Sequence, residues 1–253
     1  MPIAQSAGDH VLSPLALLTT LPIARRMELP RASYGLFPAV GLLLGAILVG
    51  IDELAGLVLP TSASSALVVV ALVALTGALH LDGLADSADG IFVGGDRDRR
   101  LAIMRDPHIG AFGVVAVVAV LLLKWGALIP LDGWLRTGSL LLIPALARWS
   151  LLPLMTIFPP ARSDGMAFQV QSWSRWLQVV FGSAIVAALS LAVFWPTGLA
   201  LLGPALLAAL AIGWYATQRL GGVTGDVYGA TVEIGEAVLL LVVATSISHP
   251  WLT

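Results

Sequence analysis

The sequence has no cysteine and few charged residues. The absence of cysteine among its 253 residues excludes disulfides, thiolate metal sites and cysteine nucleophiles. Charged residues make up only 11% of the chain, whereas hydrophobic residues make up 58%, and the mean hydropathy is +0.94. Because no basic stripe with interleaved aromatic residues is present, nucleic acid is not expected as a partner. A chain this apolar is predicted to be an integral membrane protein.

Seven apolar runs each approach the ~20 residues that a helix needs to cross a bilayer. They cover residues 34–52, 62–80, 109–130, 138–158, 176–195, 198–217 and 235–249. A shorter N-terminal stretch, 11–23, is interrupted by Pro14 and Pro22 and predicts an interfacial or re-entrant helix. No linker or repeat divides the chain. We therefore expect one domain, residues 1–253, with an all-α, polytopic membrane bundle of about seven transmembrane helices.

Arginine is distributed unevenly between the two predicted sides of the membrane. If the chain alternates direction through seven spans, only Arg136 falls on one side. The opposite side receives Arg25, Arg26, Arg31, Arg97, Arg99, Arg100, Arg105, Arg162, Arg175 and Arg219. By the positive-inside rule the arginine-rich side is cytoplasmic. Most acidic residues fall on this side too, so we expect the active site at the cytoplasmic face.

Three aspartates follow the second apolar run with helical spacing. Intervals of four and three residues place Asp82, Asp86 and Asp89 on one face of a helix, whereas a strand would turn Asp89 away from the other two. No lysine or arginine lies between them, so a cation is the expected partner for carboxylates that lose hydration at a membrane edge. Oxygen ligands favour Mg²⁺, with Mn²⁺ as the alternative.

Two later segments add acids and phosphate-binding groups on the same predicted side. In residues 104–110, Arg105 can hold a phosphate and Asp106 can complete a metal shell. In residues 221–236, glycine amides can approach an anion and Thr224 can donate a hydrogen bond. We predict that the acids of this second segment face the first aspartate cluster; they are Asp226, Glu233 and Glu236.

Isolated charges also occur inside the apolar runs. Lys124 is predicted to form a buried pair, to contact substrate or to extend its amine to the membrane surface. Arg148 is a candidate partner for a buried phosphate or carboxylate. A further loop, containing Arg162, Asp164 and Gly165, is a weaker candidate for substrate contact. Together these residues indicate metal-assisted transfer of a phosphate-bearing group.

Three separated blocks resemble the signature blocks of the cobalamin synthase, or adenosylcobinamide-GDP ribazoletransferase, family. They are residues 80–90, 101–113 around Met-Arg-Asp, and 221–226, and they occur in family order at comparable spacing. The resemblance implies that a hydroxyl of α-ribazole, or of its 5′-phosphate, attacks the phosphate attached to cobinamide, and that GMP departs. It also implies Mg²⁺ and a bacterial or archaeal cytoplasmic membrane.

The resemblance also implies roles for individual residues. Metal binding is carried onto Asp82, Asp86, Asp89, Asp106 and Asp226, and Glu233 is added as a sixth candidate ligand. Asp106 or Asp226 is the expected general base. The predicted substrate-binding residues are His80, Arg105, Lys124, Arg148, Gly222, Thr224 and Gly225. Pro107 and His108 depart from the family pattern of a small polar residue followed by arginine, so no role is inherited by His108.

Other classes of protein share some of these features. CDP-alcohol phosphotransferases have a metal-binding Asp-Gly helix, but this chain lacks their Ala-Arg after the first Asp-Gly and their later Gly-x-x-x-Asp-x-x-x-Asp. Membrane prenyltransferases typically need two Asp-rich motifs of a different pattern. A divalent cation transporter would need polar residues along a path to the far side, where this chain is nearly bare. The expected surroundings are a lipid bilayer, and the sequence is compatible with a homo-oligomer.

Overall fold

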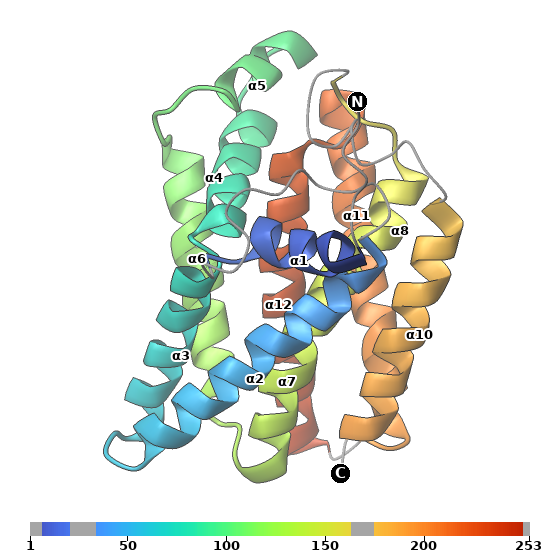
Figure 1. Cartoon of the computed structure of the whole chain (residues 1–253). Coiled ribbons are helices and arrows are strands. Elements are labelled where there is room, and N and C mark those ends of the chain that lie inside the picture. Colours follow the sequence, from blue (N-terminus) through green and yellow to red (C-terminus); the bar gives the residue numbers. More distant parts are fainter. Residues whose placement is uncertain (1–6, 21–33, 163–174, 250–253) are drawn as a thin grey trace.

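The computed structural model describes residues 7–20, 34–162 and 175–249. Within those ranges the regular elements are helices, and a single isolated β-bridge joins Pro160 to Val223. By length and composition, six helices are able to cross a membrane, and a bent pair supplies a seventh span if counted as one. The predicted all-α, polytopic membrane fold is confirmed (Figure 1).

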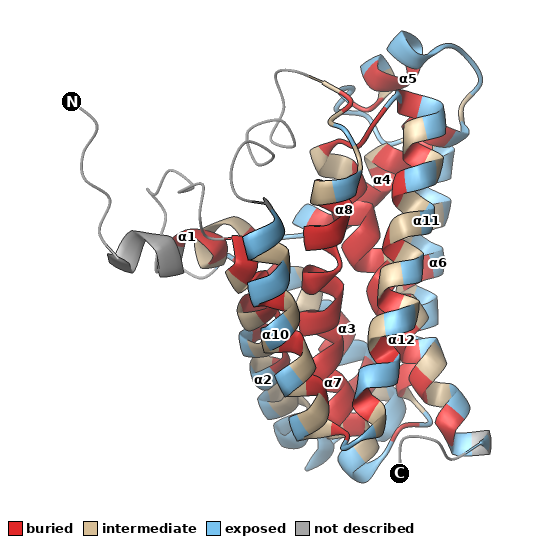
Figure 2. Cartoon of the chain, turned by 90° about the vertical axis from the view of Figure 1, so that its right-hand side faces the viewer, coloured by how far each residue is buried: buried red, intermediate tan, exposed pale blue. Residues whose placement is uncertain are grey.

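The spans are arranged as an up-and-down bundle (Figure 1). In chain order the helices are α1 (Ala7–Leu18), η1 (Tyr34–Leu36), α2 (Phe37–Gly56), α3 (Thr61–Leu75), α4 (Leu79–Phe92), α5 (Arg97–Ile103), α6 (Ala111–Leu128), α7 (Gly133–Trp149), α8 (Leu151–Ile157), α10 (Arg175–Val193), η2 (Thr197–Leu201), α11 (Leu202–Leu220) and α12 (Gly225–Ser248). The α7–α8 pair and α12 have the largest buried shares of the six spans (Figure 2). Residues on these central helices can therefore form a polar site screened from lipid.

The short α1 does not cross the bundle from end to end. Its twelve residues lie across the front of the spans at mid-height (Figure 1). At its end, the backbone N–H of Thr20 donates to the carbonyl of Leu75, 2.8 Å away. The Thr20 hydroxyl donates to the carbonyl of Ala74 at 3.1 Å. Because these carbonyls belong to the last turn of α3, the residue pair that follows α1 caps the point where that helix stops.

The predicted second span, 62–80, is two helices rather than one. α3 ends at Leu75 and α4 begins at Leu79, with a bend of 87° between them. At the break, Gly77 and Ala78 both have positive φ, 61° and 58°, a conformation that stops an α-helix. The aspartates therefore lie on the second half of a broken span rather than after the end of a straight one, with Asp82 exposed, Asp86 half-buried and Asp89 buried.

The last span begins ten residues earlier than predicted. Hydropathy indicated a helix from residue 235, but α12 starts at Gly225. Asp226 and Glu233 therefore belong to the helix and not to a loop before it. The start of the span was misplaced because acids in the first half of α12 lower its apparent hydrophobicity, while in the folded protein Glu233 and Glu236 are paired with buried cations.

Arginines gather at the end of the bundle that carries α5. The described ones are Arg97, Arg99, Arg100, Arg105, Arg162 and Arg219. Arg25, Arg26, Arg31 and the side chain of Arg175 lie outside the described residues. At the opposite end Arg136 forms a two-point ion pair with Asp52, with both N–O distances 2.6 Å. The predicted separation of basic residues thus holds for the described part of the chain.

Candidate active site

Helices α4 and α12 approach each other closely through two glycines. A Cβ atom on Gly83 would lie 2.8 Å from the backbone carbonyl oxygen of Asp226 and 3.2 Å from the Cα of Gly229. A Cβ on Gly229 would in turn lie 3.0 Å from the carbonyl oxygen of His80. Small residues are the usual means of bringing two membrane helices into backbone contact. This contact sets the aspartates of α4 beside Asp226 of α12.

Substitution of Gly83 by alanine tests this packing. The new methyl group would force α4 and α12 apart, and we expect a loss of about 1–3 kcal/mol in the free energy of unfolding together with reduced activity. The matched control is Gly235→Ala on α12, whose Cβ would meet the Ala147 methyl group at an ordinary 3.9 Å. Thermal unfolding in detergent should separate the two variants. Equal unfolding midpoints would contradict the packing account.

The loop before α12 is pinned to the segment that follows α8. The backbone N–H of Val223 donates to the carbonyl of Pro159, and that of Ala161 donates to the carbonyl of Val223, both at 2.8 Å. A Cβ on Gly222 would stand only 2.4 Å from the Pro159 carbonyl oxygen. Gly222, predicted to contact substrate, thus permits this backbone pairing. The pairing holds Arg162, the next residue along the chain, opposite the start of α12.

Thr224 and Asp226 organise the start of α12. The Thr224 hydroxyl accepts a hydrogen bond from the backbone N–H of Val227 at 3.3 Å, so Thr224 is the N-cap. The same hydroxyl lies 3.1 Å from a carboxylate oxygen of Asp226 and donates to it. Asp226 also lies in the first turn of the helix, where the positive end of the helix dipole favours a carboxylate or a phosphate.

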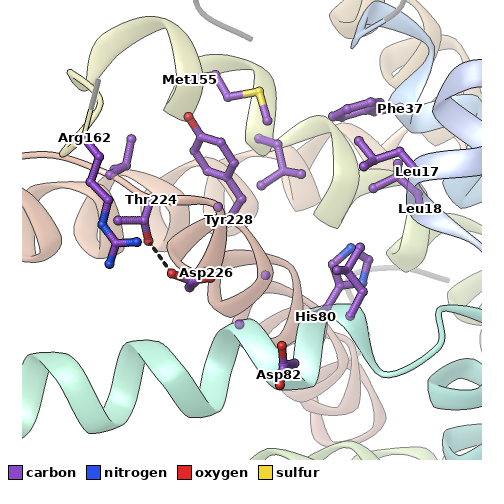
Figure 3. A pocket seen from close by; sticks show the side chains of 16 residues that line it. Leu17, Leu18, Phe37, His80, Asp82, Met155, Arg162, Thr224, Asp226 and Tyr228 are labelled. Carbon is purple, nitrogen blue, oxygen red and sulfur yellow. Dashed lines mark hydrogen bonds between the residues drawn. The ribbon is translucent and has the colours of Figure 1, made fainter. Parts of the chain in front are cut away.

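A cavity of about 240 Å³ opens at this junction. Its polar side is lined by Asp82 of α4, by Thr224 and Asp226 at the start of α12, and by Arg162 (Figure 3). Gly225, a predicted substrate-binding residue, also lines it. Carboxylates from two helices and one guanidinium thus face a common space. That set can hold a cation, orient a phosphate and accept a proton from a hydroxyl.

The fit of a Mg²⁺ ion depends on Asp82, Asp86 and Asp226. Asp86 lies one turn beyond Asp82, is half-buried, and is close enough for the charges of Asp82 and Asp226 to act on it. In the described ranges, no group of three acidic, histidine or cysteine side chains is already arranged as a metal cage. Mg²⁺ usually binds through one or two carboxylates together with water and substrate phosphates. The donor set suits an ion whose shell is completed by substrate.

Asp89 has a different partner. Its two carboxylate oxygens accept hydrogen bonds from the backbone N–H groups of Gly110, at 2.7 Å, and Gly113, at 2.9 Å. Because these amides belong to the N-cap and first turn of α6, the buried Asp89 caps that helix from outside. Both of its oxygens are used by these amides, so we revise its predicted metal role to a structural one.

Lys124, Arg148, Glu233 and Glu236 form a buried ionic cluster between α6, α7 and α12. The Lys124 ammonium lies 2.5 Å from Glu233 and 2.6 Å from Glu236, and Arg148 lies 2.5 Å from Glu236. Each of the four side chains is at most 4% exposed. None of the four lines the cavity. We therefore revise the predicted metal role of Glu233 and the predicted substrate contacts of Lys124 and Arg148 to mutual charge neutralisation.

Arg105 and Asp106 lie at the α5 end of the bundle, outside the cavity. Asp106 is exposed and accepts hydrogen bonds from the backbone N–H of His108, at 2.9 Å, and from its ring, at 2.6 Å. The backbone hydrogen bond from His108 is the main cause that lowers the pKa of Asp106, which makes it a weaker base. Asp226 is therefore the better placed of the two predicted bases.

Arg105 belongs to a second, shallower hollow. It lines a space of about 460 Å³ together with Arg97, Asp98 and Arg162. Arg162 also lines the cavity beside Asp226, so the two spaces are adjacent. A phosphate bound at Arg162 would therefore lie between an aspartate-lined cavity and an arginine-lined surface.

Comparison with known proteins accounts for most of the chain. The sequence profile of the family described as cobalamin-5-phosphate synthase matches residues 10–244. The chain belongs to this family. A relative from Pseudomonas paraeruginosa, named adenosylcobinamide-GDP ribazoletransferase, is 41% identical over 95% of this chain and 99% of its own length. A relative of the same name from Geotalea daltonii is 39% identical over 90% and 93%. No solved structure matches the chain.

The family match confirms the resemblance that the three signature blocks carried. Two polar residues that line the cavity, however, were not fully predicted from the sequence. Arg162 was named only within a weaker candidate loop, whose Asp164 and Gly165 lie outside the described residues. Tyr228, which also lines the cavity, was not named at all. Its spacing offered a signal, because Tyr228 lies about one helical turn after Thr224 and so shares its side of α12.

Proposed function

We propose that this protein is an adenosylcobinamide-GDP ribazoletransferase that joins its two substrates in the cavity between α4 and α12. The observation that carries the proposal is the convergence of Asp82, Asp226 and Arg162 on one space from three separate segments. The family and the names of its relatives supply the reaction. The products are adenosylcobalamin, or its 5′-phosphate, and GMP.

The attacking group is a hydroxyl of α-ribazole or α-ribazole 5′-phosphate. Asp226 accepts the hydroxyl proton as the new O–P bond forms at the phosphorus attached to cobinamide. The bridging P–O bond of the pyrophosphate breaks, and its electron pair leaves with GMP. Arg162 holds the phosphoryl oxygens and reduces their negative charge in the transition state. The hydroxyl of Thr224 keeps the Asp226 carboxylate oriented.

The nucleotide half of adenosylcobinamide-GDP is placed over the arginine-lined hollow. Arg105 and Arg162 supply positive charge there, and Arg162 connects the hollow to the cavity. By the positive-inside rule this end of the bundle faces the cytoplasm of a bacterial cell, where the nucleotide substrate is available. The active site is thus proposed to open at the cytoplasmic face of the inner membrane.

Mg²⁺ is the proposed cofactor, and Mn²⁺ can replace it. Asp82, Asp86 and Asp226 are the side chains that would hold the ion. When bound, the ion supplies positive charge that neutralises phosphate oxygens and stabilises the leaving group. Asp89, Asp106 and Glu233 are left out of this set because each has another partner.

The direct test is an assay of the purified protein in detergent. With adenosylcobinamide-GDP, α-ribazole and Mg²⁺ we expect release of one GMP for each corrinoid product formed. Chelation with EDTA should abolish the release, and added Mg²⁺ or Mn²⁺ should restore it. Full activity in the presence of the chelator would contradict the metal assignment. Metal uptake by loaded liposomes without GMP formation would favour a transporter instead.

A further inference from the structure

The cavity between α4 and α12 has an apolar side opposite the aspartates. Leu17 and Leu18 from the end of α1, Phe37 from the start of α2, and Met155 from α8 line it. Figure 3 shows Leu17, Leu18 and Phe37 on the far side of the cavity from Arg162, with Met155 near Tyr228 between the two sides. One continuous space therefore offers charged groups at one side and an apolar, partly aromatic surface at the other.

His80 is a buried polar group beside this apolar side. It lines the cavity, is only 3% exposed, and lies on the side of Leu17 and Leu18 (Figure 3). Neither ring nitrogen, Nδ1 or Nε2, has a hydrogen-bond partner within the part of the chain that the structure describes. An uncharged imidazole carries one N–H donor and one acceptor, and a buried polar group without a partner is costly. The ring is thus suited to a ligand with a complementary polar atom.

The two sides of the cavity together match one of the two substrates. A ribazole nucleoside has a flat, fused aromatic base with one free ring nitrogen, joined to a ribose that carries the attacking hydroxyl. The corrin ring of the other substrate is far too large for about 240 Å³. Between the two sides the cavity is lined by Tyr228 and by Gly83, Gly225 and Gly229.

We propose that the apolar side binds the aromatic base of the ribazole, and that His80 donates a hydrogen bond to its free ring nitrogen. Bound in this way, the ribose lies toward Asp226, at the side where the phosphate is attacked. His80 is then a residue that determines specificity for the base. This inference rests on the proposed function, because it assumes that a ribazole nucleoside is the attacking substrate.

The test compares His80→Phe with the native protein on two nucleosides. One is α-ribazole, whose base is dimethylbenzimidazole; the other is the riboside of dimethylindole, in which carbon replaces the free ring nitrogen. The native protein should prefer α-ribazole by at least about tenfold in kcat/KM, since a site built for a hydrogen bond rejects an analogue that lacks the acceptor. In His80→Phe this preference should disappear. The KM for adenosylcobinamide-GDP should stay within about twofold of native.

His249→Phe is the matched control, because His249 is exposed at the opposite end of the chain; it should keep the native preference. If His80→Phe does not fold, competitive binding of the two nucleosides to the native protein gives the same answer. Equal binding or equal turnover of α-ribazole and the indole analogue by native protein would overturn the role of His80 while leaving the proposed function intact. Absence of GMP release with either nucleoside would instead refute the proposed function.

Discussion

Replacing Asp226 with asparagine should lower kcat by about 10²–10⁴-fold, which is the usual contribution of a general base. The change keeps the volume of the side chain and its contact with Thr224, so the start of α12 should stay intact. With Mg²⁺ at saturation, where Asp82 and Asp86 remain to hold the ion, KM for both substrates should change much less than kcat, because the proton is transferred only in the transition state. Initial rates of GMP release from purified protein measure both constants.

The control for this variant is Glu53→Gln, which removes an exposed carboxylate at the opposite end of the bundle. It should leave kcat within about twofold of native, because a distant charge in water is screened. If Asp226→Asn retained native kcat, Asp226 would not be the base. The same measurement on Asp106→Asn would then decide whether the exposed aspartate of the α5 end fills that role.

Replacing Lys124 with methionine should cause the largest loss of stability. Lys124 lies within 2.6 Å of both Glu233 and Glu236, and all three side chains are buried. Without the ammonium, two buried carboxylates face each other with only Arg148 to balance them. Removal of one partner from a buried ion pair costs about 3–5 kcal/mol. The unfolding midpoint in detergent should fall by roughly 10 °C.

A second substitution separates charge balance from packing. In Lys124→Met with Glu233→Gln, the Arg148–Glu236 pair remains and the cluster is again neutral. The double variant should therefore unfold at a higher temperature than Lys124→Met alone. If it unfolded at a lower temperature, charge balance would not explain the cluster. If Lys124→Met were as stable as the native protein, the ion pairs would contribute nothing to the fold.

Hydropathy was sufficient to predict the fold class but not the ends of two spans. Residues 62–80 form an unbroken apolar run, yet the chain turns at Gly77 and Ala78 because Thr20 of a distant segment binds the end of α3. No local pattern contains that contact. In α12, Glu233 and Glu236 lowered the hydropathy of a segment that is helical and membrane-spanning. Their partners, Lys124 and Arg148, lie about 90 to 110 residues earlier in the sequence.

In the candidate site too, the sequence predicted which residues share a helix, but not which contacts they make with segments far away in the chain. Helical spacing correctly placed Asp82 and Asp86 near one another, and the family blocks pointed to Thr224 and Asp226. Spacing also grouped Asp89 with them, but its carboxylate is used by the amides of α6, a contact that depends on how the chain returns after α5. A sequence pattern states which residues share a helix face, not which neighbour each one meets.

The central claim is that phosphoryl transfer occurs in the cavity between α4 and α12. The most direct measurement is an experimentally determined structure of the Asp226→Asn variant with adenosylcobinamide-GDP and Mg²⁺. The account predicts that the pyrophosphate lies between Asp82 and Arg162, with the guanine nucleotide over the hollow lined by Arg105. A pyrophosphate bound anywhere else, for example at the Arg136 end of the bundle, would contradict it.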